Sequence, residues 1–212
     1  MDVRRLLPLS GVVFVVLALV AVIGLGGDTP DIDAPASEVA SYYQDHSARQ
    51  AAGAFLLAVA VPFLVFFAAS IAVRLRRPAE DRPAWRYVLL GGAAVTAAAL
   101  LVTAAVVFAL ADGGDNEISG EALQALNVLG SDTWVAFNAG FGVMMIGAAG
   151  CLLGGALVPR WLAWVALVLG ILLFIPFADF FALLLTLIWI IVVSIVLFSR
   201  PGTADPVEAA AA

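Results

Sequence analysis

WLAWVALVLGILLFIPFADFFALLLTLIWIIVVSIVLF, residues 161–198, decides the fold, because it is almost wholly apolar and carries one ionisable side chain, Asp179. As one helix, its 38 residues would extend about 57 Å, nearly twice the hydrocarbon thickness of a bilayer. Pro176 disfavours helical geometry at the residue before it, and Asp179 is a good N-cap for a helix that begins at Phe180. The stretch therefore predicts a tight turn between two shorter spans, residues 159–175 and 180–199.

Asp179 itself allows two interpretations. In the first, it lies at the outer rim of the membrane and caps the last helix. In the second, it is a buried carboxylate in a pathway, since an ionisable group inside a membrane is costly and usually functional. Its position at a turn that helix length imposes favours the cap.

Four further stretches are apolar over the roughly 20 residues that a helix needs to cross a bilayer. They are residues 6–26, 51–73, 87–110 and 134–157. The first follows two arginines, as a signal peptide would, but its long apolar region and the lack of a small-residue cleavage site predict a retained anchor. The chain is therefore predicted to be an all-α, polytopic membrane helix bundle with six transmembrane helices in one domain, residues 1–200. A disordered cytoplasmic tail, residues 201–212, follows.

The composition of the 212-residue chain supports this class. Hydrophobic residues make up 64% and charged residues only 12%, about half the charged fraction of a soluble domain. The net charge of −6 argues against nucleic-acid binding, which needs clustered positive charge. One cysteine and one histidine are too few for a disulfide or a Cys/His zinc site. We therefore expect no metal and no cofactor.

The arginines predict which helix ends lie inside the cell. With the N-terminus inside, nine of the ten arginines fall on the inner side and only Arg49 lies outside. The inner ones are Arg4, Arg5, Arg74, Arg76, Arg77, Arg82, Arg86, Arg160 and Arg200. This strong positive-inside signal predicts that both termini are cytoplasmic. A five-span chain would instead place Arg200 outside and would need one oversized helix.

Two outer segments, residues 27–50 and 111–132, are long enough to fold. We expect each to contain a short capped helix, the first lying on the membrane interface, and the two together to form a lid over the bundle. The expected caps are Ser37, Ser119, and Ser131 or Asp132; the expected helix breaks are Gly113, Gly114 and Gly130.

Few side chains inside the spans could carry chemistry. Most polar ones are small hydroxyls, which can bond the backbone of their own helix. Asn138 differs, because an amide in lipid needs partners: we expect a hydrogen bond across helices, with a ligand role as the alternative. At the outer surface, Asp45 and His46 could supply acid–base groups, although consecutive residues on a helix point apart. The candidate ligand-binding residues are Asn138, Asp45, His46 and Asp179, and no catalytic residue is assigned.

Small residues recur along the fourth span at Gly147, Gly150 and Gly154. Small residues on one face let helix backbones approach closely, which is how membrane helices associate. Packing within the bundle is the simpler interpretation. The alternative is a homo-oligomer in which this face meets a second copy.

Four phrases, ASEVASYYQDHSAR, the LRR link, VPRWLAWVALVLGILL and LIWIIVVSIVLFSR, resemble a group of actinobacterial six-span integral membrane proteins of unknown function. The likeness extends over most of the chain. It implies the six-span plan and a bacterial plasma membrane, and it carries no activity, cofactor or site residue.

Three functions stay open at this point. The sequence favours a non-enzymatic accessory or interaction protein of the cell envelope, surrounded by the lipid bilayer. The alternative is a transporter or channel for a neutral or lipophilic small molecule, with a cavity near Asn138 and Pro62. The third is an outer-surface enzyme or sensor, which requires Asp45 and His46 to converge with another polar group such as Glu38.

Overall fold

The structure, a computed structural model, describes residues 6–74, 83–154 and 158–199, and these are helical apart from short connections. The elements are η1 (Leu7–Leu9), α2 (Ser10–Leu19), the π-helix η2 (Val20–Gly26), α3 (Ala36–Arg74), α4 (Pro83–Asp115), α5 (Gly120–Asp132), α6 (Trp134–Leu153), α7 (Arg160–Leu172) and α8 (Asp179–Ser199). The all-α prediction is confirmed for these residues. The predicted disordered tail and the arginines at 4, 5, 76, 77, 82 and 200 lie outside them.

Among the described residues, five helical stretches are long and apolar enough to cross a membrane. They are Leu7–Gly26, Ala36–Arg74, Ala84–Asp115, Gly120–Leu153 and Asp179–Ser199. The span predicted at residues 159–175 forms the shorter helix α7, whose 13 residues extend only about 20 Å. The protein is thus a membrane-type bundle, while a sixth crossing and the side on which the termini lie stay predictions.

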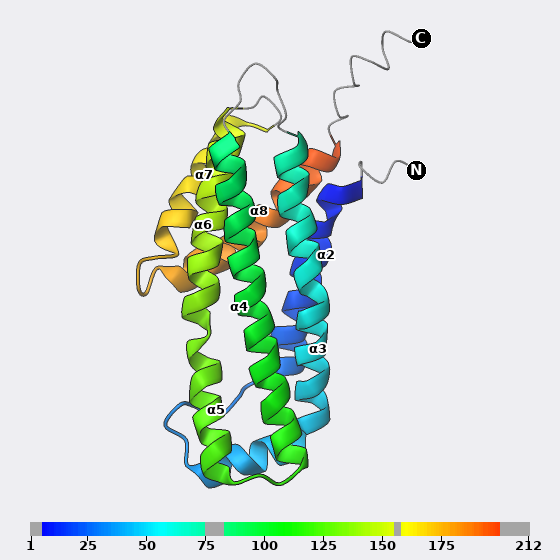
Figure 1. Cartoon of the computed structure of the whole chain (residues 1–212), viewed down its shortest axis with the longest axis vertical. Coiled ribbons are helices and arrows are strands. Elements are labelled where there is room, and N and C mark those ends of the chain that lie inside the picture. The colour runs from blue at the N-terminus through cyan, green and yellow to red at the C-terminus, as the bar shows by residue number, and fades with distance from the viewer. Residues whose placement is uncertain (1–5, 75–82, 155–157, 200–212) are drawn as a thin grey trace.

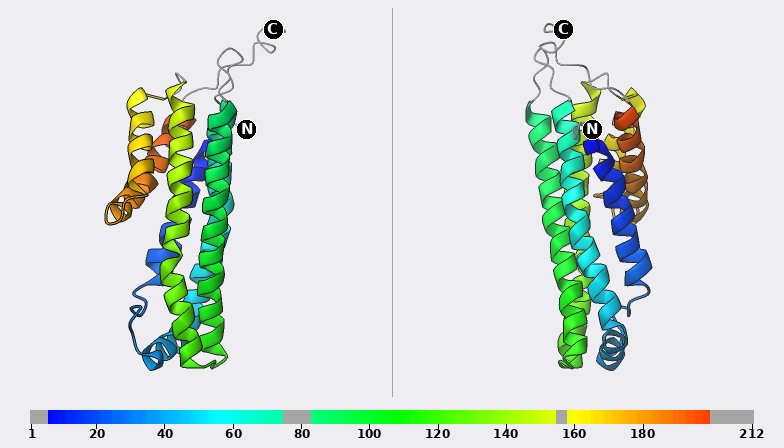
Figure 2. Two further views of the ribbon diagram at one scale, coloured as in Figure 1. Left: turned by 60° about the vertical axis from the view of Figure 1, so that its left-hand side comes forward. Right: turned by 90° about the vertical axis from the view of Figure 1, so that its right-hand side faces the viewer.

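The long apolar stretch at the C-terminal end breaks where the sequence predicts. α7 ends at Leu172 and α8 begins at Asp179. Within the turn, Phe177 adopts the left-handed region with φ at 69°. Figure 2 shows α7 and α8 as an antiparallel hairpin whose tip lies partway along the longer helices.

The expected break at Gly113 and Gly114 is wrong, because α4 continues through both to Asp115. Gly114 serves close packing instead. A Cβ at this position would lie 2.5 Å from the backbone of Tyr43 on α3. The glycine therefore lets two helices touch and does not end one.

α5 and α6 form one nearly continuous rod, against the expectation that Gly130 ends the first helix. Thr133 alone separates them and keeps helical dihedral angles, with φ at −63° and ψ at −20°. Because the chain stays helical here, α6 has no side-chain cap, and Ser131 and Asp132 do not supply one. Ser119 does cap α5 as predicted, accepting a hydrogen bond from a backbone N–H of its first turn.

α3 joins the expected interfacial helix and the second span into one helix of 39 residues. Ser37 therefore lies in its first turn and does not precede it. Figure 1 shows these first turns running across the end of the bundle, beside α5, before the helix follows the bundle's length.

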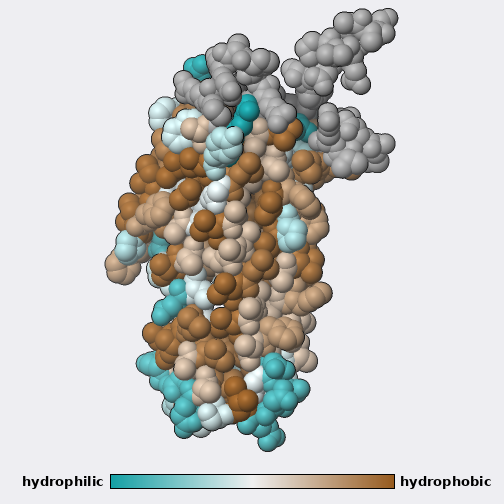
Figure 3. Space-filling view, in the orientation of Figure 1, coloured by the Kyte–Doolittle hydropathy of each residue, from teal (hydrophilic) through white to brown (hydrophobic). Residues whose placement is uncertain are grey.

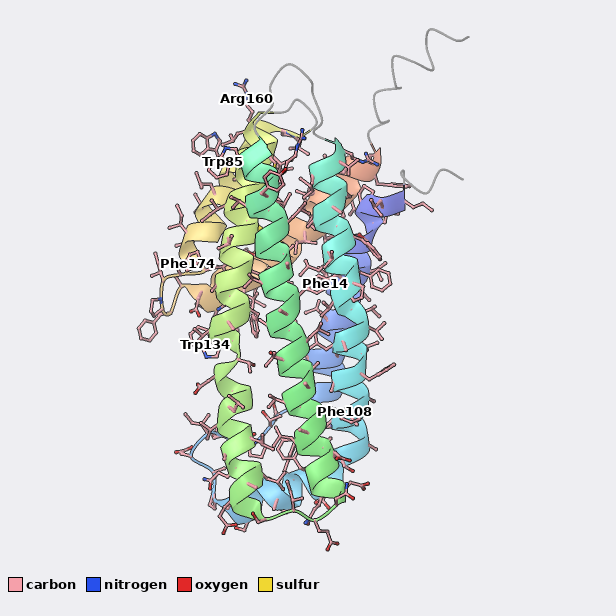
Figure 4. All side chains as sticks on the ribbon, viewed as in Figure 1. Phe14, Trp85, Phe108, Trp134, Arg160 and Phe174 are labelled. Carbon is pink, nitrogen blue, oxygen red and sulfur yellow. The ribbon has the colours of Figure 1, made fainter. Side chains whose placement is uncertain are left out.

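The two ends of the bundle differ in chemistry. Arg74, Arg86 and Arg160 lie at one end, where Figure 4 labels Arg160 beside Trp85. The other end, here called the acidic cap, comprises residues 27–50 and 106–133. Figure 3 shows polar side chains concentrated on this cap and apolar ones covering much of the bundle beyond it.

Exposed aromatic residues mark both edges of the apolar region. Trp85, Tyr87, Trp161 and Trp164 lie toward the arginine end, and Trp134, Phe174, Phe177, Phe180 and Phe181 lie toward the cap. Along α6, the distance from Trp134 to Leu153 is about 28 Å at 1.5 Å per residue. This matches the hydrocarbon thickness of a bilayer, at whose edges aromatic side chains are enriched.

α6 packs against α4 through glycines. A Cβ at Gly147 would collide with the backbone of Leu89, and one at Gly150 would collide with the indole of Trp85. Both glycines are therefore covered within the chain, whereas a Cβ at Gly154 would have no neighbour closer than 3.9 Å among the described residues. The predicted homo-oligomer stays a prediction, and Gly147 and Gly150 are not free to form its contact.

Candidate functional site

The acidic cap has a small apolar core of its own. Val39 and Tyr43 of α3 pack with Leu110 of α4 and Leu123 of α5. This core is separate from the main core of the bundle. It joins three helices and the connection at residues 27–35 into one unit.

Asn127 of α5 fixes the connection with both ends of its amide. Its Oδ1 accepts from the Tyr43 hydroxyl at 3.1 Å. Its Nδ2 donates to the carbonyl oxygens of Pro30 at 3.1 Å and Asp31 at 3.4 Å. One turn earlier, Gln124 donates to the carbonyl of Ala34 at 2.9 Å. An otherwise irregular segment is therefore held by a buried amide, Asn127, and a half-buried one, Gln124.

A second set of bonds ties the end of η2 to α3. Gln50 is 2% exposed, and its Nε2 donates to the carbonyl of Gly26 at 2.6 Å and to the Tyr42 hydroxyl at 2.9 Å. Arg49 also donates to that hydroxyl, at 3.2 Å. The Tyr42 hydroxyl donates in turn to Gly26 at 3.3 Å. Both ends of the connection are thus bonded to the helices.

The surface of the cap is acidic. Ten carboxylates are exposed: Asp28, Asp31, Asp33, Glu38, Asp45, Asp112, Asp115, Glu117, Glu121 and Asp132. Arg49 is the one arginine among the cap residues, so ten negative charges against one positive charge leave an excess of nine. None of the ten forms an ion pair within the described residues. The excess charge is therefore open to water and to a partner.

The structure does not bring Asp45 and His46 into one hydrogen-bonded group. The His46 ring stacks on Tyr42, and its Nδ1 lies 2.9 Å from the Tyr42 carbonyl oxygen. Asp45 and Glu38 are exposed, and their side chains make no hydrogen bond within the described residues. The arrangement holds His46 in place on its own helix and assembles no acid–base pair.

A shallow hollow of about 170 Å³ lies on the cap between α3 and α4. Its lining residues are Ser47, Ala48, Ala51, Phe108, Ala111, Asp112 and Asp115. They include neither Asn138 nor Pro62, near which a transport cavity was expected. No group of three or more potential metal-ligating side chains occurs within the described residues.

Asn138 and Asp179 meet between α6 and α8. Nδ2 of Asn138 donates to Oδ2 of Asp179 at 3.1 Å, and the two residues are 4% and 8% exposed. The predicted hydrogen bond across helices is therefore present. The predicted cap is not, because Asp179 is the first residue of α8 and its own N–H bonds the carbonyl of Ile175. The preceding turn supplies these backbone partners, which leaves the carboxylate for Asn138.

Within the described residues, two buried polar atoms on this side of the bundle lack hydrogen-bond partners: Oδ1 of Asn138 and the hydroxyl of Thr186 on α8. The other hydroxyls behave as predicted. Ser70, Thr96 and Ser194 each donate to a carbonyl of their own helix. Unsatisfied buried polar groups are rare in proteins, so these two atoms are candidates for a further hydrogen-bond partner.

Sequence reasoning missed the amides that order the cap, Gln50, Gln124 and Asn127. One signal was present: Asn127 follows Leu123 by four residues and so shares its apolar face. Its partners, however, lie more than 80 residues away along the chain.

Comparison with protein-family models, with curated proteins and with solved structures gives no match for this chain. The resemblance to a six-span actinobacterial family therefore stays a prediction.

Proposed function

We propose that this chain is a multi-pass protein of the bacterial plasma membrane that acts as a non-enzymatic interaction protein. Its acidic cap faces away from the cytoplasm and binds a partner protein with a basic surface. The observation that carries the proposal is the cap itself, a fixed structure whose ten exposed carboxylates have no ion-pair partner in the described chain.

Order in the cap supports a binding role, because a preorganised surface loses less conformational freedom when it binds. The bonds from Asn127, Gln124 and Gln50 fix residues 26–34. They present Ile32, 58% exposed, between two exposed aspartates. An apolar side chain inside a charged rim is a common arrangement for a binding anchor.

The location of the cap is testable by labelling. A cysteine introduced at residue 32, in a variant with Cys151→Ala, should react in intact cells with a membrane-impermeant maleimide. A cysteine introduced at exposed Trp161, near the arginine end, should react only after the membrane is opened. The reverse result would contradict the proposed orientation.

The partner can be identified by site-specific photo-crosslinking. A photoreactive amino acid at residue 32 should capture one protein in native membranes, and the same amino acid at Phe66, which is 49% exposed on α3 outside the cap, is the control position. The captured protein is then purified, and its binding to the full-length chain is measured. Asp28→Asn, Asp31→Asn, Asp33→Asn and Glu38→Gln in combination should lower the association rate about tenfold, since charge steers association.

Salt provides an independent check on the same pair, because screening weakens long-range attraction between exposed charges. Association should slow as ionic strength rises, and slow less in the neutralised variant. If the captured protein has no basic surface and binds equally well to the neutralised variant, the proposal is wrong.

A further inference from the structure

The strongest unassigned feature is the polar pair between α6 and α8. Asp179 receives one hydrogen bond, from Nδ2 of Asn138, although a carboxylate can accept about four. Oδ1 of Asn138 receives none and is enclosed. The second carboxylate oxygen also has no partner within the described residues. The pair therefore offers acceptor oxygens and has one donor.

No cationic side chain balances this carboxylate within the described residues. Arg49 bonds Tyr42 in the cap, Arg74 bonds the Leu197 carbonyl and Arg86 lies near Cys151, both at the arginine end. Arg160 lies at the opposite end of α7 from the hairpin tip (Figure 4). A buried carboxylate without a cation or several donors is costly in an apolar environment. The position calls for a positively charged hydrogen-bond donor from outside the chain.

The surroundings suit a cation that carries an apolar tail. Five apolar side chains around the turn are 45% to 94% exposed: Phe174, Ile175, Phe177, Phe180 and Phe181. The Phe174 ring packs on Gly142, one turn along α6 from Asn138. Aromatic rings attract cations through their faces and pack against hydrocarbon.

Backbone strain marks the same turn. Phe177 has φ at 69°, in the left-handed region that side chains other than glycine seldom adopt. Such strain concentrates at sites where the surrounding structure has a use for it. The strained residue, Phe177, is also 94% exposed, and it precedes Asp179 by two residues.

The depth of the site matches the head groups of one leaflet. From Asp179 to Ser199, α8 extends about 30 Å, the thickness of the hydrocarbon core. With Ser199 near the arginine end, Asp179 lies toward the opposite surface, level with the start of α6. Asp179 keeps 8% of its surface exposed, which gives a head group at this depth access to the carboxylate.

We propose that Asp179 and Asn138 form a binding site for a primary ammonium group. The N–H groups of the ammonium donate to the Asp179 carboxylate and to Oδ1 of Asn138, while the phenylalanines around the turn contact the attached hydrocarbon. Two sources share this chemistry: the head group of phosphatidylethanolamine and a free small amine. The site is independent of the acidic cap and of its proposed partner.

Native mass spectrometry of the full-length protein tests the site. The protein is purified in mild detergent and mixed with equal amounts of phosphatidylethanolamine, phosphatidylcholine and phosphatidylglycerol. The protein should retain about ten times or more as much phosphatidylethanolamine as either other lipid. A charge-assisted hydrogen bond contributes enough binding free energy to change affinity by about this factor. Phosphatidylcholine is the matched control lipid, because its trimethylammonium group carries the same positive charge but has no N–H to donate.

Two variants locate the effect. Asp179→Asn should abolish the preference, and Asn138→Leu should reduce it without abolishing it, because the carboxylate remains as an acceptor. Asp132→Asn is the control, because it removes one exposed carboxylate from the same rod, outside the site, and should leave retention unchanged. Thermal unfolding of each variant establishes that it is folded before its binding is compared.

Competition distinguishes the two sources. If millimolar ethylammonium displaces the lipid, the site accepts free amines; if it does not, the site requires the lipid, and both results support an ammonium site. Equal retention of phosphatidylcholine, or full retention by a folded Asp179→Asn variant, would overturn the proposal. Stabilisation by sodium but not by amines, lost in Asp179→Asn, would also overturn it and would indicate a metal-ion site.

Discussion

Asn127 and Asn138 lie eleven residues apart on the α5–α6 rod, and each is 4% exposed. Asn127 uses both ends of its amide, bonding Tyr43 and two backbone carbonyls. Asn138 uses one end, and its Oδ1 has no partner among the residues that the structure describes. Equal burial therefore accompanies two different roles: the first amide completes a structure, and the second belongs to the site that we propose for an ammonium group.

The two halves of the rod also pack by different means. In the cap, α5 is held by hydrogen bonds from amide side chains to the connection at residues 27–35. In the apolar half, α6 meets α4 through Gly140 and Gly147, where the backbones touch. The difference in packing reflects the surroundings of each half. In lipid, the burial of apolar side chains contributes little, so close packing through small residues holds helices together.

The largest effect is expected from Gly147→Ala in the apolar half. The new Cβ would collide with the backbone of Leu89, which cannot move away as a flexible side chain can. We expect a loss of about 3 kcal/mol in the free energy of unfolding. Thermal unfolding in one detergent, followed by circular dichroism, measures it.

Gly154→Ala is the matched control, since no described atom lies closer than 3.9 Å to the new Cβ. It should change stability by less than about 0.5 kcal/mol. Equal stability of the two variants would mean that α4 and α6 are not in backbone contact.

Asn127→Ala should have the next largest effect and should act on the cap. It leaves the Tyr43 hydroxyl and the Pro30 carbonyl without their partner, at a cost of about 2 kcal/mol. We expect limited proteolysis to cut faster within residues 27–35, with little change in the apolar half. Asn116→Ala, which removes an exposed amide, is the control. Unchanged proteolysis would show that the amide does not order the connection.

Tyr43→Phe isolates one of these bonds. The ring stays in its apolar cluster while the hydroxyl that donates to Asn127 is lost. A loss of about 1 kcal/mol is expected, smaller than that of Asn127→Ala because the two carbonyl contacts survive. A cost equal to that of Asn127→Ala would place the whole effect in this bond.

The sequence was sufficient for features that depend on neighbours along the chain. Helix length and Pro176 predicted the turn before Asp179, and Ser119 was predicted to cap α5. It was insufficient where a distant segment decides. Gly114 looked like a helix break because nothing local shows that Tyr43 packs on it. Likewise, Asp179 looked like a cap because Asn138 is 41 residues away.

The smallest effect is expected where Asn138 and Asp179 are both replaced by leucine, in detergent free of amines. A buried polar pair can be exchanged for apolar side chains of similar volume at little or no cost, because no unpaired group is left behind. We expect a change within about 1 kcal/mol.

The single variants should behave differently. Asn138→Leu removes the one donor to a buried carboxylate, and Asp179→Leu leaves the amide wholly unsatisfied, so each should cost about 2 kcal/mol. The double variant should therefore be more stable than the sum of the singles predicts. Strict additivity would mean that the two side chains do not act together. Asn138 would then be no different in kind from an ordinary core residue, and its contrast with Asn127 would disappear.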